Sequence, residues 1–197
     1  MKKLYTLLAL TISFSMNAQM SDNSSGTSAT GNYSVAMGSS TTASGNYSTA
    51  MGQNTTASGN YSTALGVSTT ANGGSSTAMG VGTSASGNRS TAMGSGTIAS
   101  GNYSTAMGED STASGQASTA IGYGSVASDF ASTVIGQYNS SGSSATSAGS
   151  FSTSNTAFVI GNGADSSNKS DAFKVMFNGD TYVSSSLYIG GTAITST

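Results

Sequence analysis

The side chains in this sequence that could carry out chemistry are the hydroxyls of Ser, Thr and Tyr, seven carboxylates and five cationic groups. The 197 residues include no Cys and no His, which excludes thiol nucleophiles, Ser-His-Asp triads and the usual zinc sites. A Ser-Lys pair could use only Lys169 or Lys174, in a region without any sign of a pocket. We therefore predict no enzymatic activity, no catalytic residue and no cofactor.

One short segment is close to a metal-binding motif. Gly161-Asn162-Gly163-Ala164-Asp165 matches the Gly-x-Gly-x-Asp core of calcium-binding nonapeptides, but it occurs once and Ile160 stands where a first Gly belongs. We interpret it as a turn and predict no metal site. The Asn-x-Ser/Thr sequons follow from a repeated unit and are not interpreted as glycosylation sites. They lie at Asn32, Asn46, Asn60, Asn88 and Asn102.

Charge is scarce along the chain. Charged residues make up 6% of it, against roughly 25% in an ordinary globular domain. The formal net charge is −2 and the pI is near 4.5, a balance that disfavours nucleic-acid binding because such binding needs a basic stripe. Without Cys, stability must come from packing or assembly and not from disulfides.

Residues 1–18 are typical of a signal peptide. Lys2 and Lys3 provide a positive start, residues 4–14 form a short apolar run, and cleavage is expected near Ala18. The run is shorter than the roughly 20 residues of a membrane span. We therefore predict an exported protein with no membrane span in this chain, and no lipid anchor because no Cys follows the run.

A 14-residue unit repeats eight times over residues 29–140 without insertion or deletion. The unit reads Ala-Ser-Gly-Asn-Tyr-Ser-Thr-Ala-Met-Gly-x-x-Thr-Thr. A disordered linker would not keep large apolar residues in one phase for eight periods, and a helix is disfavoured by the density of Gly and Thr. Alternation over 33–37 predicts a strand, residues 41–43 predict a second, and turns are expected at Gly38 and Gly45. The unit therefore predicts one coil of a parallel β-solenoid, and eight coils would make a rod roughly 38 Å long.

The two faces of the longer strand have different compositions. We expect Ala36 and Ala43 to fill the interior of a coil, because only small side chains fit between two such close strands. The large residues then point outward and form an apolar stripe, which needs a partner and favours threefold self-association. The opposite assignment of the faces stays open. The residues predicted for the core of this homotrimer are Val35, Met37, Met51, Leu65, Met79, Met93, Met107, Ile121 and Ile135.

Two further columns offer alternatives. One holds Tyr33, Tyr47, Tyr61 and Tyr103, interrupted by Ser75, Arg89, Ala117 and Ala131. It is interpreted as packing a trimer interface or a seam, or else as an aromatic contact surface for a ligand. A Thr column could order water on a flat face and bind ice. Its members are Thr41, Thr55, Thr69, Thr83 and Thr97, continued by Ser111, Ser125 and Asn139.

The repeats resemble a known family. Segments such as Asn46-Tyr47-Ser48-Thr49-Ala50-Met51-Gly52 and Thr55-Thr56-Ala57-Ser58-Gly59 are similar to the head repeats of YadA-like trimeric autotransporter adhesins, which read roughly Asn-Ser-Val-Ala-Ile-Gly and then Ser-x-Ala-x-Gly. The resemblance covers residues 29–140. It implies an all-β, left-handed parallel β-roll, an obligate trimer, a bacterial surface location and adhesion to host or environmental surfaces.

The composition changes after the repeats. Residues 141–156 are interpreted as a connector or a degenerate coil, and residues 157–197 as a β-rich neck or tail. A strand is expected at 158–161, and a hairpin at 173–183 with a type I′ turn at Asn178-Gly179. A further strand is expected at 187–189. This tail resembles the neck that precedes an endosialidase-type intramolecular chaperone domain in surface fibres and phage-like tail fibres.

These observations favour the head of a non-enzymatic adhesin at the bacterial cell surface, associated with the outer membrane, or in the extracellular space. Its expected partners are other copies of itself and an extracellular matrix protein or glycan. The alternatives are a structural segment of a secreted or phage-like fibre that precedes a self-cleaving chaperone, and an ice-binding protein.

Overall fold

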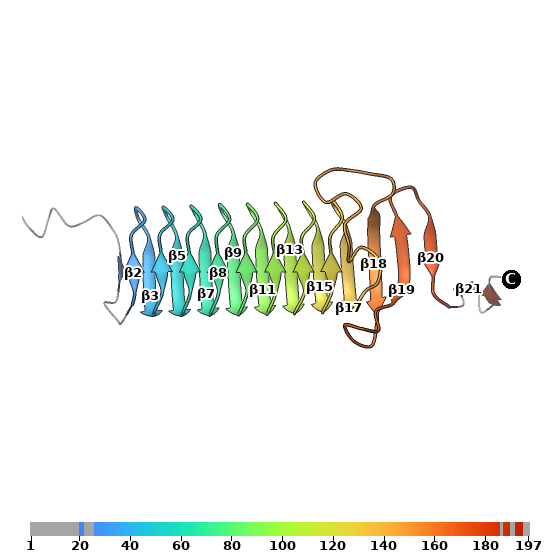
Figure 1. Ribbon diagram of the computed structural model, residues 1–197, viewed down its shortest axis with the longest axis horizontal. Coiled ribbons are helices and arrows are strands. Elements are labelled where there is room, and N and C mark those ends of the chain that lie inside the picture. The colour runs from blue at the N-terminus through green and yellow to red at the C-terminus, as the bar shows by residue number, and fades with distance from the viewer. Residues whose placement is uncertain (1–19, 22–25, 186, 190–191, 195–197) are drawn as a thin grey trace, which may run out of the picture.

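The computed structural model describes residues 20–21, 26–185, 187–189 and 192–194. Within these residues there is no helix, and the strands form sheets of twelve, eight and two strands. Figure 1 shows a rod in which successive coils stack along the long axis, with β18, β19 and β20 at one end. The fold is therefore the all-β parallel solenoid that the repeats predict.

The twelve-stranded sheet contains the longer strands. In spatial order they are β1 (Met20–Ser21), β3 (Val35–Ser39), β5 (Thr49–Gln53), β7 (Thr63–Val67), β9 (Thr77–Val81), β11 (Thr91–Ser95), β13 (Thr105–Glu109), β15 (Thr119–Tyr123), β17 (Thr133–Gln137), β18 (Thr156–Asn162), β19 (Asp171–Met176) and β20 (Thr181–Val183).

The eight-stranded sheet contains the short strands of the opposite wall. They are β2 (Ser28–Ala29), β4 (Thr42–Ala43), β6 (Thr56–Ala57), β8 (Thr70–Ala71), β10 (Ser84–Ala85), β12 (Ile98–Ala99), β14 (Thr112–Ala113) and β16 (Val126–Ala127). A separate pair is formed by β21 (Leu187–Ile189) and β22 (Thr192–Ile194).

Each coil lies in register with the next at a spacing of one repeat. Met93 pairs with Met107 and Ala85 with Ala99, always in parallel. Identical columns therefore stack on one another along the rod. This is why the sequence keeps its period without insertion: a single extra residue would turn every following side chain to the opposite face.

The core is a double row of alanines. Ala36 and Ala43, and their equivalents in later coils, are completely buried, which confirms the expected assignment of the faces. Val134 and Val159 take the alanine position in the last two strands that follow this pattern. Because the interior of a coil holds only small side chains, the larger Met, Leu and Ile side chains of the longer strands lie outside.

The glycine after each large apolar residue is needed for close stacking. Gly94 has a φ of +124°, and a Cβ there would lie 1.9 Å from the carbonyl oxygen of Gly108. The expectation that Gly38 forms a turn was wrong, because Gly38 lies within β3. Gly45 does begin a turn, in which the backbone N–H of Ser48 donates to the Gly45 carbonyl at 3.2 Å.

The corners of the coil have left-handed backbone at two positions. Tyr47 adopts a φ of +57° at the third position of its turn, as a type II turn requires, and Asn54 adopts +54° at the other corner. An asparagine ladder runs beside the first corner. The backbone N–H of Asn46 donates to Oδ1 of Asn60 at 3.0 Å, and Asn88 donates likewise to Asn102. These asparagines, read in the sequence as sequons, thus link neighbouring coils.

The parallel stacking of strands continues across the segment in which the repeat is broken. Residues 141–155 contain no strand and form the long loop between β17 and β18 in Figure 1. Asp129 fixes this loop: its carboxylate accepts hydrogen bonds from the backbone N–H groups of Thr146 at 2.6 Å and Thr156 at 2.8 Å. Asp129 replaces a glycine of the repeat, at a coil where no further repeat stacks on that position.

The hairpin expected in the tail is present, but its turn is of another type. β19 pairs antiparallel with β20, and β18 pairs with β19. The type I′ prediction was wrong, because Gly179 has positive φ (+94°) whereas Asn178 does not. The backbone N–H of Gly179 donates to the carbonyl of Met176, and the N–H of Met176 donates to the carbonyl of Asp180. This is the arrangement of a type I turn followed by a glycine bulge.

One prediction concerns residues outside the described part. The signal peptide over 1–18, with its cleavage near Ala18, lies wholly outside the described residues. Among the described residues there is no helix that is long and apolar enough to cross a bilayer.

Candidate interaction surface

The outer face of the twelve-stranded sheet carries the predicted apolar stripe. Its central column lies opposite to the buried alanines, and its members are half-buried or exposed: Met37 is 38% exposed and Ile121 is 40% exposed. The column comprises Met37, Met51, Leu65, Met79, Met93, Met107, Ile121 and Ile135. Nothing in the described chain covers it. Val35 lies on the same face but in the neighbouring column, where later coils have Thr.

The stripe extends beyond the residues predicted from the sequence. Ile160 pairs with Ile135 and with Phe173, and Phe173 pairs with Val183. Paired residues of neighbouring strands share a face, so the apolar column runs without a break from β3 to β20. The continuation of the stripe could be recognised in the sequence of Phe158-Val159-Ile160-Gly161. As in the coils, an outward, an inward and a second outward residue are followed by a glycine.

A surface of this length is unusual for a protein that stays alone in solution. Contiguous exposed apolar patches beyond a few hundred Å² mark interaction sites or aggregation-prone regions. The flanking column of the same face includes further exposed apolar side chains, of which Val67 is 41% exposed and Val81 is 55% exposed. The strands beneath are rigidly paired on both sides, so the stripe is a preformed, straight surface.

The tyrosine column lies at a corner, beside the stripe. Tyr33, Tyr47 and Tyr61 stack with ring centroids 5.0 Å apart. Further along, Nη1 of Arg89 donates to the hydroxyl of Tyr103 at 2.7 Å, with the guanidinium carbon 5.3 Å from the ring centroid. Each of these residues has a φ near +57°, which costs a bulky side chain more than it costs Gly or Asn.

The proposed ice-binding ladder is not on the surface. Thr41, Thr55, Thr69, Thr83 and Thr97 are at most 1% exposed, so that interpretation was wrong. The reason is the alternation of the short strand: Thr41 lies two residues before the buried Ala43 and points to the same side. Ser111, Ser125 and Asn139, which continue the column, are buried as well.

The carboxylate of Asp165 is used by its own loop. It accepts hydrogen bonds from the side chain of Asn168 and from the backbone N–H of Ser167 at 2.8 Å. These bonds, that of Asn168 first, hold the pKa of the Asp165 carboxyl below its ordinary value. In the described residues no three or more His, Cys, Asp or Glu side chains gather as a metal would require.

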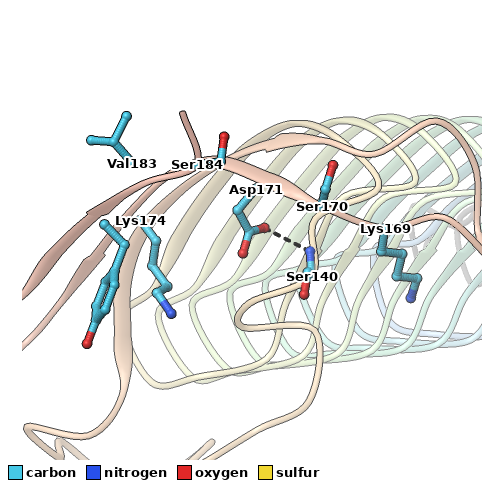
Figure 2. A pocket seen from close by; sticks show the side chains of 8 residues that line it. Ser140, Lys169, Ser170, Asp171, Lys174, Val183 and Ser184 are labelled. Atoms are coloured by element: carbon cyan, nitrogen blue, oxygen red, sulfur yellow. Dashed lines mark hydrogen bonds between the residues drawn. The ribbon is translucent and has the colours of Figure 1, made fainter. Parts of the chain in front are cut away.

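The two lysines considered for catalysis border a cleft of about 330 Å³ at the end of the rod. Figure 2 shows Lys174 and Lys169 on either side of Asp171, whose Oδ1 accepts a hydrogen bond from the backbone N–H of Ser140 at 2.8 Å. Nζ of Lys174 lies 4.2 Å from the ring centroid of Tyr182. No hydrogen bond joins a serine hydroxyl to either lysine in the part of the chain that the structure describes.

One more titratable group is perturbed near the end of the stripe. A hydrogen bond with Tyr123, together with desolvation, raises the pKa of Tyr138 to about 12. The two rings meet edge to face with centroids 5.0 Å apart. This contact joins the corner of the last repeat to the flank of the stripe.

The repeats that build this architecture match a known protein-family model. The model of the YadA head domain repeat matches residues 29–55, 43–69, 57–77, 71–97, 99–125 and 113–139, more than half of the chain. The chain belongs to the YadA head-repeat family. Its YadA-type repeats are therefore an adhesin-like structural domain of the kind found in trimeric autotransporters, a family that is surface-exposed and in general non-enzymatic. No curated protein matches the chain significantly.

Proposed function

We propose that this protein is the head of a non-enzymatic bacterial adhesin, held as a homotrimer by its apolar stripe. The observation that carries the proposal is the uninterrupted column from Met37 to Val183 on one outer face of a YadA-type solenoid. Three copies that bring their stripes to a common axis would remove this surface from water. We also infer that residues 1–18 direct export and are removed, so the trimer acts at the cell surface or beyond it.

The adhesive role is tested with the full chain on an array of purified extracellular matrix proteins and glycans. We expect retention on a subset of spots by the wild-type protein. A Met93→Asp variant, which places a charge in the middle of the stripe, should lose multivalent retention through loss of assembly. A matched Thr70→Asp variant, on the outer face of the opposite sheet, should bind normally. Absence of retention on every spot would contradict adhesion.

A structural segment of a secreted or phage-like fibre is the second candidate. It is favoured by the way β18, β19 and β20 prolong the sheet beyond the repeats, which would carry one stripe from a head into a following shaft. In that case the assembled protein would form stable rods but would be retained by none of the array's surfaces.

A further inference from the structure

The tyrosine column is first interrupted in the fourth coil, at Ser75. In the fourth coil this corner is formed by Gly74 and Ser75. The third coil has Asn60 and Tyr61 at the same positions, and the fifth coil has Asn88 and Arg89. Both outward side chains of that corner are therefore reduced to a hydrogen and a hydroxymethyl group. A Cβ at Gly74 would meet only Oδ1 of Asn88, at 3.3 Å, so the corner is open there.

The gap has the height of one aromatic ring. Tyr47 and Tyr61 stack at 5.0 Å with their planes 1° apart, so the rings follow the coil spacing along the rod. Coils are about 4.8 Å apart, which places the level of Arg89 about 10 Å from the ring of Tyr61. A ring midway between them would stand about 5 Å from each, the spacing of the ladder itself.

Both walls of the gap favour an aromatic ligand. Tyr61 is 63% exposed, more than Tyr47 at 50%, because Ser75 leaves one face of its ring uncovered. On the other side Arg89 is held against Tyr103 by its hydrogen bond and by the cation–π contact, which presents the guanidinium at a fixed position. A tyrosine face stacks on aromatic rings, and a guanidinium attracts their electron-rich faces.

We propose that the gap at Gly74 and Ser75, between Tyr61 and Arg89, binds an exposed aromatic side chain of an extracellular protein. An aromatic ring is favoured over a saccharide because the gap has the spacing of the stacked ring ladder, and a saccharide is the alternative that the competition experiment tests. Nucleobases are disfavoured by the acidic balance of the chain. The proposal deepens the adhesive role and rests on it for the source of the ligand, but the site itself does not require assembly.

The experiment uses N-acetyl-tryptophanamide as the probe. The protein contains no Trp, so all indole emission comes from the probe, and its anisotropy rises as the probe binds. We expect saturable binding of the full chain in roughly the millimolar range, as for one ring between two stacking partners. N-acetyl-leucinamide should not compete, and methyl glucoside should not compete. Absence of binding, or equal competition by either compound, overturns the proposal.

Two variants locate the site. Ser75→Tyr restores the residue of the neighbouring coils, fills the gap and should weaken binding at least about tenfold. Ala117→Tyr adds a ring to the same column but covers only the open face of Tyr103, so its affinity should equal that of the wild type. Loss of binding in Ala117→Tyr, or unchanged binding in Ser75→Tyr, contradicts the assignment.

The mass of the variants separates this site from the proposed assembly. Ser75→Tyr should have the same sedimentation mass as the wild type, because the gap lies at a corner and not on the stripe. A change in mass would show that the column belongs to a subunit contact and would overturn the proposal. A monomeric wild type that still binds the probe would refute the homotrimer alone.

Discussion

Ile135 lies directly opposite Ile160, although 25 residues separate them where the repeat would allow 14. The extra residues leave the rod as a loop, and the chain returns in the same register, with Gly136 beside Gly161. A loop can be inserted here because it leaves both the alanine core and the outer stripe in phase. The preserved register shows that the stripe, and not only the repeat, is continuous through the break.

The sulfur atoms of the stripe give a chemical probe of assembly. Met37, Met51, Met79, Met93 and Met107 lie in one column and are accessible in a single chain. In a trimer they would be covered, so peroxide should oxidise them at least about tenfold more slowly than in protein diluted below the dissociation constant of the trimer. Mass spectrometry of peptides after timed exposure measures this. Equal rates at both concentrations would mean that the stripe stays exposed.

Glycine stacking predicts a sharp difference between two substitutions. Gly94→Ala places a Cβ 1.9 Å from the carbonyl oxygen of Gly108, which is held in place by the pairing of its strand. The substitution should therefore lower the free energy of unfolding by about 3 kcal/mol or more. Gly82→Ala also lies at positive φ, but its nearest atom would be 3.9 Å away, so it should cost only about 1 kcal/mol. Urea unfolding of both variants tests this, and equal losses would contradict the stacking argument.

Asn139 closes the edge of the eight-stranded sheet. Its Oδ1 accepts a hydrogen bond from the backbone N–H of Val126 and its Nδ2 donates to the Val126 carbonyl, both at 2.8 Å. Asn139→Ala leaves these groups without partners and should cost about 1–3 kcal/mol. Asn139→Asp keeps the acceptor alone and should fall between Ala and wild type in thermal unfolding. A fully stable alanine variant would show that the cap is dispensable.

Acid should weaken the loop around Asp165. The folded state lowers the pKa of this carboxyl, so the ionised form stabilises the loop at neutral pH and the contribution is lost as the pH falls below about 4. The protection of the Ser167 amide against hydrogen exchange, relative to its intrinsic rate at each pH, should fall across that range. Asn168→Ala removes the largest cause and should raise the midpoint toward the ordinary value of a carboxyl. An NMR midpoint for Asp165 at or above that value would contradict the prediction.

The repeat determines most of the solenoid in advance. Small residues at Ala36 and Ala43 define a narrow interior, so the alternation of the strand places the larger Met37 on the outer face. The same alternation, applied to the short strand, would have placed Thr41 inside. The positive φ of the second corner also left a signal, since its column includes Asn54, Gly82 and Asp110, residue types that tolerate left-handed backbone.

Other features could not be predicted from the period. Asp129 and Asn139 occupy repeat columns, and their roles depend on a loop whose path no periodicity specifies. The turn at Asn178-Gly179 depends on whether one or two residues take positive φ, which the dipeptide alone does not determine. The interruption of the tyrosine column at Ser75 was visible in the sequence, but the size of the gap there required the stacking distance between Tyr47 and Tyr61.

The most direct test of the account is the mass of the full chain by sedimentation equilibrium, with circular dichroism on the same sample. We predict a β-rich particle of three times the 19.2 kDa chain mass. Met93→Asp should shift that mass toward one chain, whereas Thr70→Asp on the opposite sheet should not. A folded, β-rich monomer of the wild-type protein would contradict the central claim that the stripe is a subunit interface.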